Sequence, residues 1–163
     1  MPQVKSLNEI LSITDCNELV SEFYSYLIEK KNSNRKLNDI EEVVYLLVSM
    51  LLDIEMEGFI DLFHQLYSLR ECLVVEQNLR QFGLHKLADL FSEAKSIYIK
   101  GKFDITQEEY EQIDPFTLDE MQSRRFEEIG ETILAKDSEI YRLGDSVCQF
   151  IKSNSAILHK SLA

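Results

Sequence analysis

Residues 43–52, Val-Val-Tyr-Leu-Leu-Val-Ser-Met-Leu-Leu, are apolar on nearly every side of a helix. A helix of this kind is buried in a globular protein, and this run is about half as long as a membrane-spanning helix needs to be. We therefore expect it to form the buried centre of a helical bundle. The preceding segment, residues 32–38, is polar and basic and predicts a loop.

On both sides of this helix, apolar residues recur every three or four positions, which is the spacing of amphipathic helices. These stripes fall at residues 19–28, 69–82, 87–98, 118–133 and 140–151. No stretch shows the strict alternation of a half-buried strand. The sequence therefore predicts an all-α fold, a single-domain bundle of about seven to eight helices over residues 1–163. Residues 153–163 are expected to form a loose tail.

Helix boundaries are marked by capping sequences and by glycine. The spacing of a capping box, in which a side chain accepts from the backbone three residues later, occurs at Ser6-Leu-Asn-Glu9, Asp15-Cys-Asn-Glu18, Thr106-Gln-Glu-Glu109 and Thr117-Leu-Asp-Glu120. Glycine suits the left-handed residue that ends a helix, and Gly58, Gly83 and Gly101 each follow or interrupt a helical pattern.

Composition places the chain among intracellular globular proteins. Its 163 residues are 45% hydrophobic and 28% charged, which is enough for one domain with a core. The cysteines, Cys16, Cys72 and Cys148, are odd in number and widely separated, so they form a poor disulfide framework and fit a reducing compartment. The N-terminus lacks the apolar stretch of a signal peptide. We expect a cytoplasmic protein without a membrane span.

The sequence offers little support for catalysis. Asp61 and His64 share one helical face, one turn after Glu57, but a metal centre in a bundle needs a second such pair, which the sequence lacks. A metal-dependent enzyme that uses Asp61 and His64 is a third alternative, which would require bound metal in the purified protein. No phosphate loop, paired-cysteine motif or nucleophile elbow occurs. We therefore expect no enzyme activity, no catalytic residue, no metal and no cofactor.

Negative charge is concentrated in one segment. The formal net charge is −12, and residues 104–145 hold 13 acidic and 4 basic residues, a net charge of −9. Such a charge opposes direct binding to nucleic acid or anionic lipid and favours basic partners, although a solvated surface is the simpler explanation. The candidate protein-binding residues are Asp104, Glu108, Glu109, Glu111, Asp114, Asp119, Glu120, Glu127, Glu128 and Glu131.

Five positions of the helix that begins near Thr117 are expected to lie along one face. They are 120, 124, 127, 128 and 131, and Arg124 interrupts the acidic face because it pairs with Glu120 one turn away. Carboxylates on several adjoining helices would then imitate a stretch of DNA phosphates, for which one helix is too sparse. Glu42, Asp53 and Glu55 are further contributors to such a surface.

Residues 57–63, Glu-Gly-Phe-Ile-Asp-Leu-Phe, resemble the Gly-Phe-x-x-aromatic-Phe signature of the bacterial DNA-mimic protein family. The segment from Phe82 to Ala94 is similar to the helix pair that follows in that family. The resemblance covers residues 40–155, and residues 1–36 correspond to a variable helical start. The chain departs from the family where Glu57 replaces a second glycine and Leu62 replaces an aromatic residue.

This resemblance implies an acidic, all-helical, often dimeric protein whose surface carboxylates imitate DNA. Its partner would be a basic DNA-binding protein, such as a helix-turn-helix transcription regulator, and the signature residues would serve packing and turn geometry. The alternative function is a helical adaptor or immunity-type module that recognises its partner through shape and apolar contacts.

Overall fold

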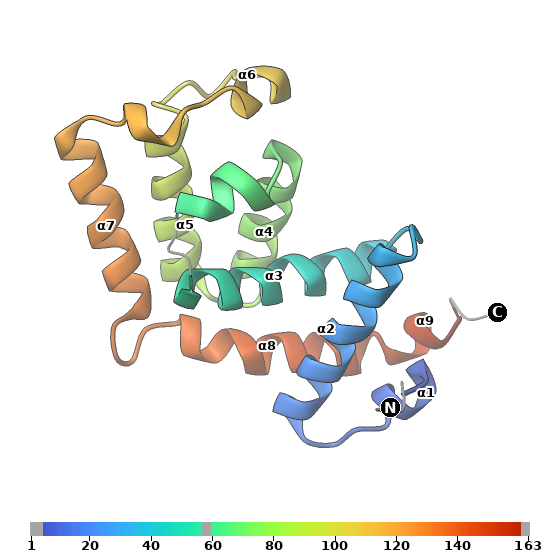
Figure 1. Cartoon of the computed structure of the whole chain (residues 1–163). Helices are drawn as coiled ribbons and strands as arrows, with labels where there is room; N and C mark the ends of the chain where they lie inside the picture. Colours follow the sequence, from blue (N-terminus) through green and yellow to red (C-terminus); the bar gives the residue numbers. More distant parts are fainter. Residues whose placement is uncertain (1–4, 57–59, 161–163) are drawn as a thin grey trace. The chain divides into compact units, whose positions relative to one another are not determined.

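A computed structural model describes residues 5–56 and 60–160, and regular structure within these residues is helical throughout, without a strand (Figure 1). The predicted all-α fold is confirmed. In chain order, the elements are α1 (Leu7–Leu11), α2 (Cys16–Asn32), α3 (Asp39–Met56), η1 (Leu62–Leu66), α4 (Leu69–Gln81), α5 (His85–Tyr98), α6 (Gln107–Glu111), η2 (Pro115–Thr117), α7 (Glu120–Leu134), α8 (Ile140–Ser153) and α9 (Ser155–Lys160).

The chain divides into two compact units. The first unit combines residues 1–49 with residues 142–163, and the second unit is the continuous segment 50–141. A single domain over residues 1–163 stays a prediction. No helix in the described ranges is long and apolar enough to cross a bilayer.

The apolar run within α3, residues 43–52, is buried as expected over most of its length. Val44 and every residue from Leu46 to Met50 are buried, whereas Leu52 is 46% exposed. Glu41, at the start of the helix, is fully buried and accepts hydrogen bonds from Lys30 Nζ at 2.8 and 3.0 Å and from the Asn38 N–H at 3.0 Å. The buried carboxylate is therefore paired and hydrogen-bonded, which is the condition under which burial is tolerated.

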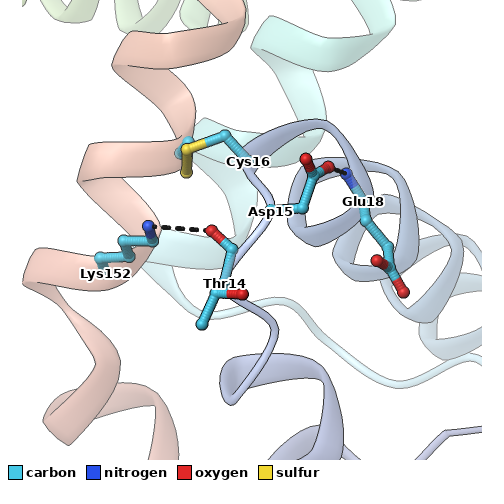
Figure 2. The surroundings of a disulfide bond; sticks show 6 residues. Thr14, Asp15, Cys16, Glu18 and Lys152 are labelled. Carbon is cyan, nitrogen blue, oxygen red and sulfur yellow. Dashed lines mark hydrogen bonds between the residues drawn. A yellow bond between two sulfur atoms is a disulfide. The ribbon is translucent and has the colours of Figure 1, made fainter.

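The first unit is covalently closed between α2 and α8. Cys16, at the start of α2, forms a disulfide with Cys148 of α8, 132 residues later in the chain (Figure 2). Beside the bridge, Lys152 Nζ donates to the Thr14 carbonyl at 3.4 Å. The expectation of unpaired cysteines is therefore wrong for two of the three, because the fold brings together two helices that are distant in sequence. Cys72 is free and buried.

The C-terminal segment is more ordered than expected. Residues 155–160 form α9, which packs against α1 and fully buries Leu158. The expected loose tail over residues 153–163 is therefore wrong for this helix, and residues 161–163 lie outside the described chain. A buried leucine anchors the segment because removing its apolar surface from water stabilises the docked position.

In the second unit, α5 packs against both α4 and α7 (Figure 1). Phe63, in the π-helical turn η1, lies at the centre of an aromatic cluster, with ring centroids 5.3 Å from Phe91, 5.5 Å from Tyr98 and 6.0 Å from Phe126. The buried hydroxyl of Tyr110 in α6 donates to the Phe63 carbonyl at 2.7 Å. These contacts support the packing role expected for the signature residue Phe63, whereas residues 57–59 of the signature lie outside the described residues.

Three of the four predicted helix starts are confirmed. Ser6, Asp15 and Thr106 each cap a helix by accepting from the backbone three residues later. The fourth prediction, Thr117, is wrong because this residue ends the 3₁₀ turn η2, and Asp119 caps α7 in a capping box with Gln122. The carboxylate of Asp119, two residues later, accepts from the Gln122 N–H and takes the capping position.

Two of the three predicted glycine stops are also confirmed. Gly83 and Gly101 follow α4 and α5 with φ angles of +79° and +72°. Both therefore occupy the left-handed region that favours glycine at a helix end. Gly58 lies outside the described residues.

Candidate protein-binding surface

Nearly all the net charge of the chain belongs to the second unit. Residues 50–141 contain 20 acidic and 9 basic residues, a net charge of −11. The first unit contains 9 acidic and 8 basic residues, a net charge of −1. All ten candidate carboxylates belong to the second unit, and each of these residues is exposed. The surface with the strongest attraction for a basic partner therefore lies on this unit.

Three of the ten carboxylates form ion pairs with neighbouring cations. Glu109 pairs with Lys102, Glu120 with Arg124 at 3.4 Å and Glu128 with Arg125 at 3.3 Å. The hydrogen bond from Lys102 lowers the pKa of Glu109 below its ordinary value. Exposed pairs of this kind contribute little to stability. They reduce the local negative charge without burying the carboxylates.

Three more accept hydrogen bonds from nearby N–H groups. Glu111 accepts from Gln107 Nε2 at 3.1 Å, Asp114 from the Phe116 N–H at 2.9 Å and Asp119 from the Gln122 N–H at 2.7 Å. Asp114 and Asp119 are therefore helix caps as well as surface charges, and replacing them would disturb η2 and α7.

The remaining four are Asp104, Glu108, Glu127 and Glu131. Within residues 5–56 and 60–160, their side chains form no hydrogen bond or ion pair. These carboxylates are the ones best placed to meet a cation from another molecule. Of the three further contributors expected from the sequence, Glu42 and Asp53 are half-buried, and the Glu55 side chain lies outside the described residues.

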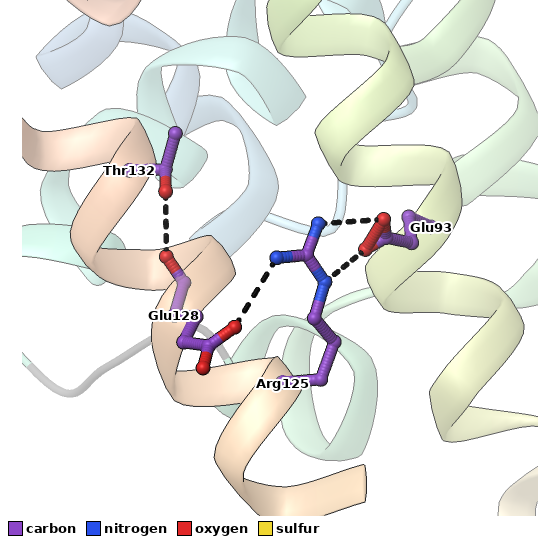
Figure 3. A network of polar contacts seen from close by, with 4 residues as sticks. All are labelled: Glu93, Arg125, Glu128 and Thr132. Carbon is purple, nitrogen blue, oxygen red and sulfur yellow. Dashed lines mark hydrogen bonds and ion pairs between the residues drawn. The ribbon is translucent and has the colours of Figure 1, made fainter.

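The structure adds one acidic residue that the sequence reasoning missed. Glu93 of α5 accepts two hydrogen bonds from Arg125 of α7, at 2.7 and 2.8 Å, and Arg125 also donates to Glu128 (Figure 3). The hydrogen bonds from Arg125 lower the pKa of Glu93. Because Glu93 precedes Arg125 by 32 residues, no local spacing signals the pair.

The acidic residues of α7 lie on two sides of the helix. Glu128 turns toward Arg125, near α5 (Figure 3). On another side, Glu120, Glu127 and Glu131 line an open hollow of about 590 Å³, here called the α7 hollow. Its other lining residues are Ile54, Ile60, Leu118, Ser123, Arg124, Phe126, Gly130 and Leu134. Of the five positions expected on one face, 120, 124, 127 and 131 line the hollow, and 128 does not.

Carboxylate density on α7 alone is lower than phosphate density on DNA. From Glu120 to Glu131 the helix rises about 16 Å, a distance over which one DNA strand presents about five phosphates. Three carboxylates and Arg124 occupy this edge, a net charge of −2. Any imitation of DNA must therefore include carboxylates of the preceding segment, residues 104–119.

Within the described chain, neither the residues considered for metal binding nor the free cysteine is arranged for catalysis. His64 is exposed, and among the described residues no group of three or more His, Cys, Asp or Glu side chains is placed to hold a metal ion. Glu57, the third residue considered for metal binding, lies outside the described residues. Burial raises the pKa of the Cys72 thiol to about 12, so the thiol stays protonated and unreactive at neutral pH.

A protein-family model described as DMP19-like protein matches residues 35–154. The chain belongs to the DMP19-like family. The matched range includes Glu93, all ten candidate carboxylates and every residue that lines the α7 hollow. Membership in the DMP19-like family is compatible with a DNA-mimic role. No curated protein and no solved structure matches the chain.

Proposed function

We propose that this member of the DMP19-like family is a non-enzymatic DNA mimic that binds a basic DNA-binding protein, such as a helix-turn-helix transcription regulator, and blocks its access to DNA. The observation that carries the proposal is the net charge of −11 on the second unit, with ten exposed carboxylates within residues 104–131. Family membership supports the same function.

The mechanism follows from how proteins grip DNA. Lys and Arg side chains of a DNA-binding protein are arranged to meet phosphates, and carboxylates at similar positions satisfy the same cations. Asp104, Glu108, Glu127 and Glu131 are available for this role without breaking an ion pair within the described chain. While they occupy the cationic surface, the regulator is unable to bind an operator.

Salt dependence provides the first test. The screening length falls from about 10 Å at 0.1 M salt to about 3 Å at 1 M, so a complex held by surface charges should dissociate over this range. The immobilised full chain is incubated with source lysate at the lower salt, and bound proteins are identified by mass. We expect to capture DNA-binding proteins. Both duplex DNA and high salt should release them from the immobilised chain. Retention of these proteins at high salt, or in excess DNA, contradicts the mimic.

Charge-neutral variants then locate the contact. Glu127→Gln with Glu131→Gln removes two carboxylates of α7, and Glu29→Gln with Asp145→Asn removes two exposed carboxylates of the first unit. We expect the first pair to weaken binding of the captured regulator and to reduce its salt dependence. The second pair, which makes the net charge less negative by the same amount, should leave the affinity and its salt dependence almost unchanged. Equal effects would mean that total charge, rather than this surface, drives binding.

An adaptor or immunity-type module remains the second candidate, because the α7 hollow combines apolar residues with its carboxylates. Such a module would recognise its partner mainly by shape and apolar contact. Charge reversal of Glu127, Glu128 and Glu131 would then leave partner binding unchanged. If the protein is a DNA mimic, the same substitutions should abolish binding to its partner.

A further inference from the structure

The α7 hollow follows a helical seam. Four of its lining residues, Ser123, Glu127, Gly130 and Leu134, are spaced by four, three and four positions along α7. This is the spacing by which one helix presents a continuous stripe to another helix. Ser123 and Gly130 are small, so a second helix can approach the stripe closely. The seam therefore has the form of a helix-docking surface.

The hollow has an apolar base. Ile54 and Phe126 line it with 3% and 6% of their surfaces exposed, and Leu134 lines it with 37% exposed. Apolar side chains inserted into this space would lose contact with water at a gain of about 25 cal/mol per Å². A flat array of carboxylates, which is sufficient for charge attraction, does not require such a base.

The charged edge of the hollow favours an occupant with positive charge. Glu120, Glu127 and Glu131 line the hollow, and Arg124, the cation among the lining residues, pairs with Glu120 at 3.4 Å. Cationic side chains beside the inserted apolar residues would meet Glu127 and Glu131. A second copy of the same edge would bring like charges together, which is unfavourable.

We propose that the α7 hollow binds a cationic amphipathic helix of the partner protein, with its apolar side chains in the hollow and its Lys or Arg side chains on the flanking carboxylates. The inference rests on the proposed function and specifies the structural element that the partner presents. From Ser123 to Leu134 the seam rises about 16 Å, which matches about three turns of a facing helix. This is a helix-in-groove mode of recognition.

Model peptides test the chemistry without a known partner. An amphipathic Leu–Lys helix, an oligolysine of equal charge and a Leu–Glu helix of opposite charge are titrated into the full chain, and binding is followed by fluorescence anisotropy. We expect the Leu–Lys helix to bind at least about tenfold more tightly than oligolysine, because oligolysine lacks the apolar anchor. The Leu–Glu helix should not bind. Equal binding of the two cationic peptides overturns the proposal.

A variant with a large side chain in the hollow, compared with a variant that has the same side chain outside it, provides a matched test. Ser123 is exposed and lines the hollow, whereas Met121 is 82% exposed and is not among its lining residues. Ser123→Trp should weaken binding of the Leu–Lys helix by about tenfold, and Met121→Trp should not. Circular dichroism confirms that both variants stay helical. Unchanged binding to a folded Ser123→Trp variant overturns the proposal.

The peptide experiment and the lysate experiment test the two proposals independently, so either proposal can fail while the other stands. If the two cationic peptides bind equally but DNA-binding proteins are captured with steep salt dependence, the hollow is not the docking site and the DNA mimic stands. If the Leu–Lys helix binds in the hollow and no DNA-binding protein is captured, helix docking stands and the proposed function fails. A lysate protein that excess duplex DNA does not release counts against the DNA mimic.

Discussion

At the scale of single residues, Cys72 and Tyr110 form a buried polar pair in the second unit. The Cys72 Sγ atom lies 3.9 Å from the Tyr110 hydroxyl, and both side chains are almost fully buried. Desolvation raises the pKa of the thiol to about 12 and also raises the pKa of the phenol. Both groups therefore hold their protons in the folded chain at pH values where the unfolded chain has begun to lose them.

The free energy of unfolding should consequently decrease as the pH rises above about 8.5, the ordinary thiol pKa. In that range the folded state binds more protons than the unfolded state, so the stability falls with pH until both states are ionised. Urea unfolding at several pH values measures the slope. Cys72→Ala should make the slope shallower than in the unsubstituted chain. If the free energy of unfolding falls equally steeply with pH in the two proteins, the raised pKa of the Cys72 thiol does not contribute to this pH dependence.

The sequence correctly indicates the nature of Cys72 but not of the other two cysteines. Its place on an apolar helical stripe predicts a small buried side chain, which the structure confirms. Cys148 lies on the apolar stripe of residues 140–151, whereas Cys16 is the half-buried first residue of α2. The bridge between them depends on packing between helices 132 residues apart. Local spacing contains no information about that distance.

At the scale of helices, Gly83 and Gly144 respond oppositely to the same substitution. Gly83 has a φ of +79°, and alanine there should destabilise the protein by about 1–2 kcal/mol. Gly144 lies within α8 with open space around the position of a new Cβ, so alanine there should stabilise the protein by about 0.5–1 kcal/mol. Thermal unfolding of both variants checks the signs. A stabilised Gly83→Ala variant would refute the left-handed helix end.

The link between α5 and α7 is tested through the protonation of Glu93. Arg125→Met removes the cation that lowers the pKa of Glu93, so this pKa should rise toward its ordinary value. Because the folded-state pKa is depressed, the stabilisation is present above the unfolded-state pKa and is lost as the pH falls. Side-chain NMR measures the titration directly. Arg124→Met, which breaks a pair with Glu120, is the control and should leave Glu93 unchanged.

Helix positions were largely predictable, whereas relations between helices were not. Apolar spacing and the caps at Ser6, Asp15 and Thr106 are local signals, and α1, α2 and α6 begin where these signals place them. The prediction that Thr117 caps a helix was wrong because the capping sequences that begin at Thr117 and at Asp119 overlap. In the structure, Asp119 caps α7. Glu93 and the apolar base of the α7 hollow depend on tertiary packing, which periodicity does not specify.

At the scale of the whole molecule, the acidic character belongs to one of the two units. The second unit has a net charge of −11, although total composition describes only an acidic protein of −12. The sequence could locate the acidic segment, since residues 104–145 alone contribute −9. Local spacing predicted the Glu120–Arg124 pair, whereas the Lys102–Glu109 and Arg125–Glu93 pairs depend on neighbours in space.

The Cys16–Cys148 bridge should stabilise the folded chain mainly by restricting the unfolded chain. For a loop of this length the chain-entropy contribution is about 5 kcal/mol, and measured values are often smaller. Reduction should therefore lower the urea midpoint of the unsubstituted chain. The doubly substituted chain, Cys16→Ser with Cys148→Ser, should start lower and be insensitive to reductant. An equal response of both proteins would show that the reductant acts elsewhere.

The bridge also makes a covalent ring of everything between residues 16 and 148, including the whole acidic unit. A protease that cuts one peptide bond inside this ring opens it without releasing a fragment, so the nicked chain keeps its full mass until it is reduced. Gel electrophoresis with and without reductant would reveal such a cut. The acidic segment, residues 104–131, to which partner binding is assigned by the proposal, therefore stays tethered to the rest of the molecule after a single cleavage.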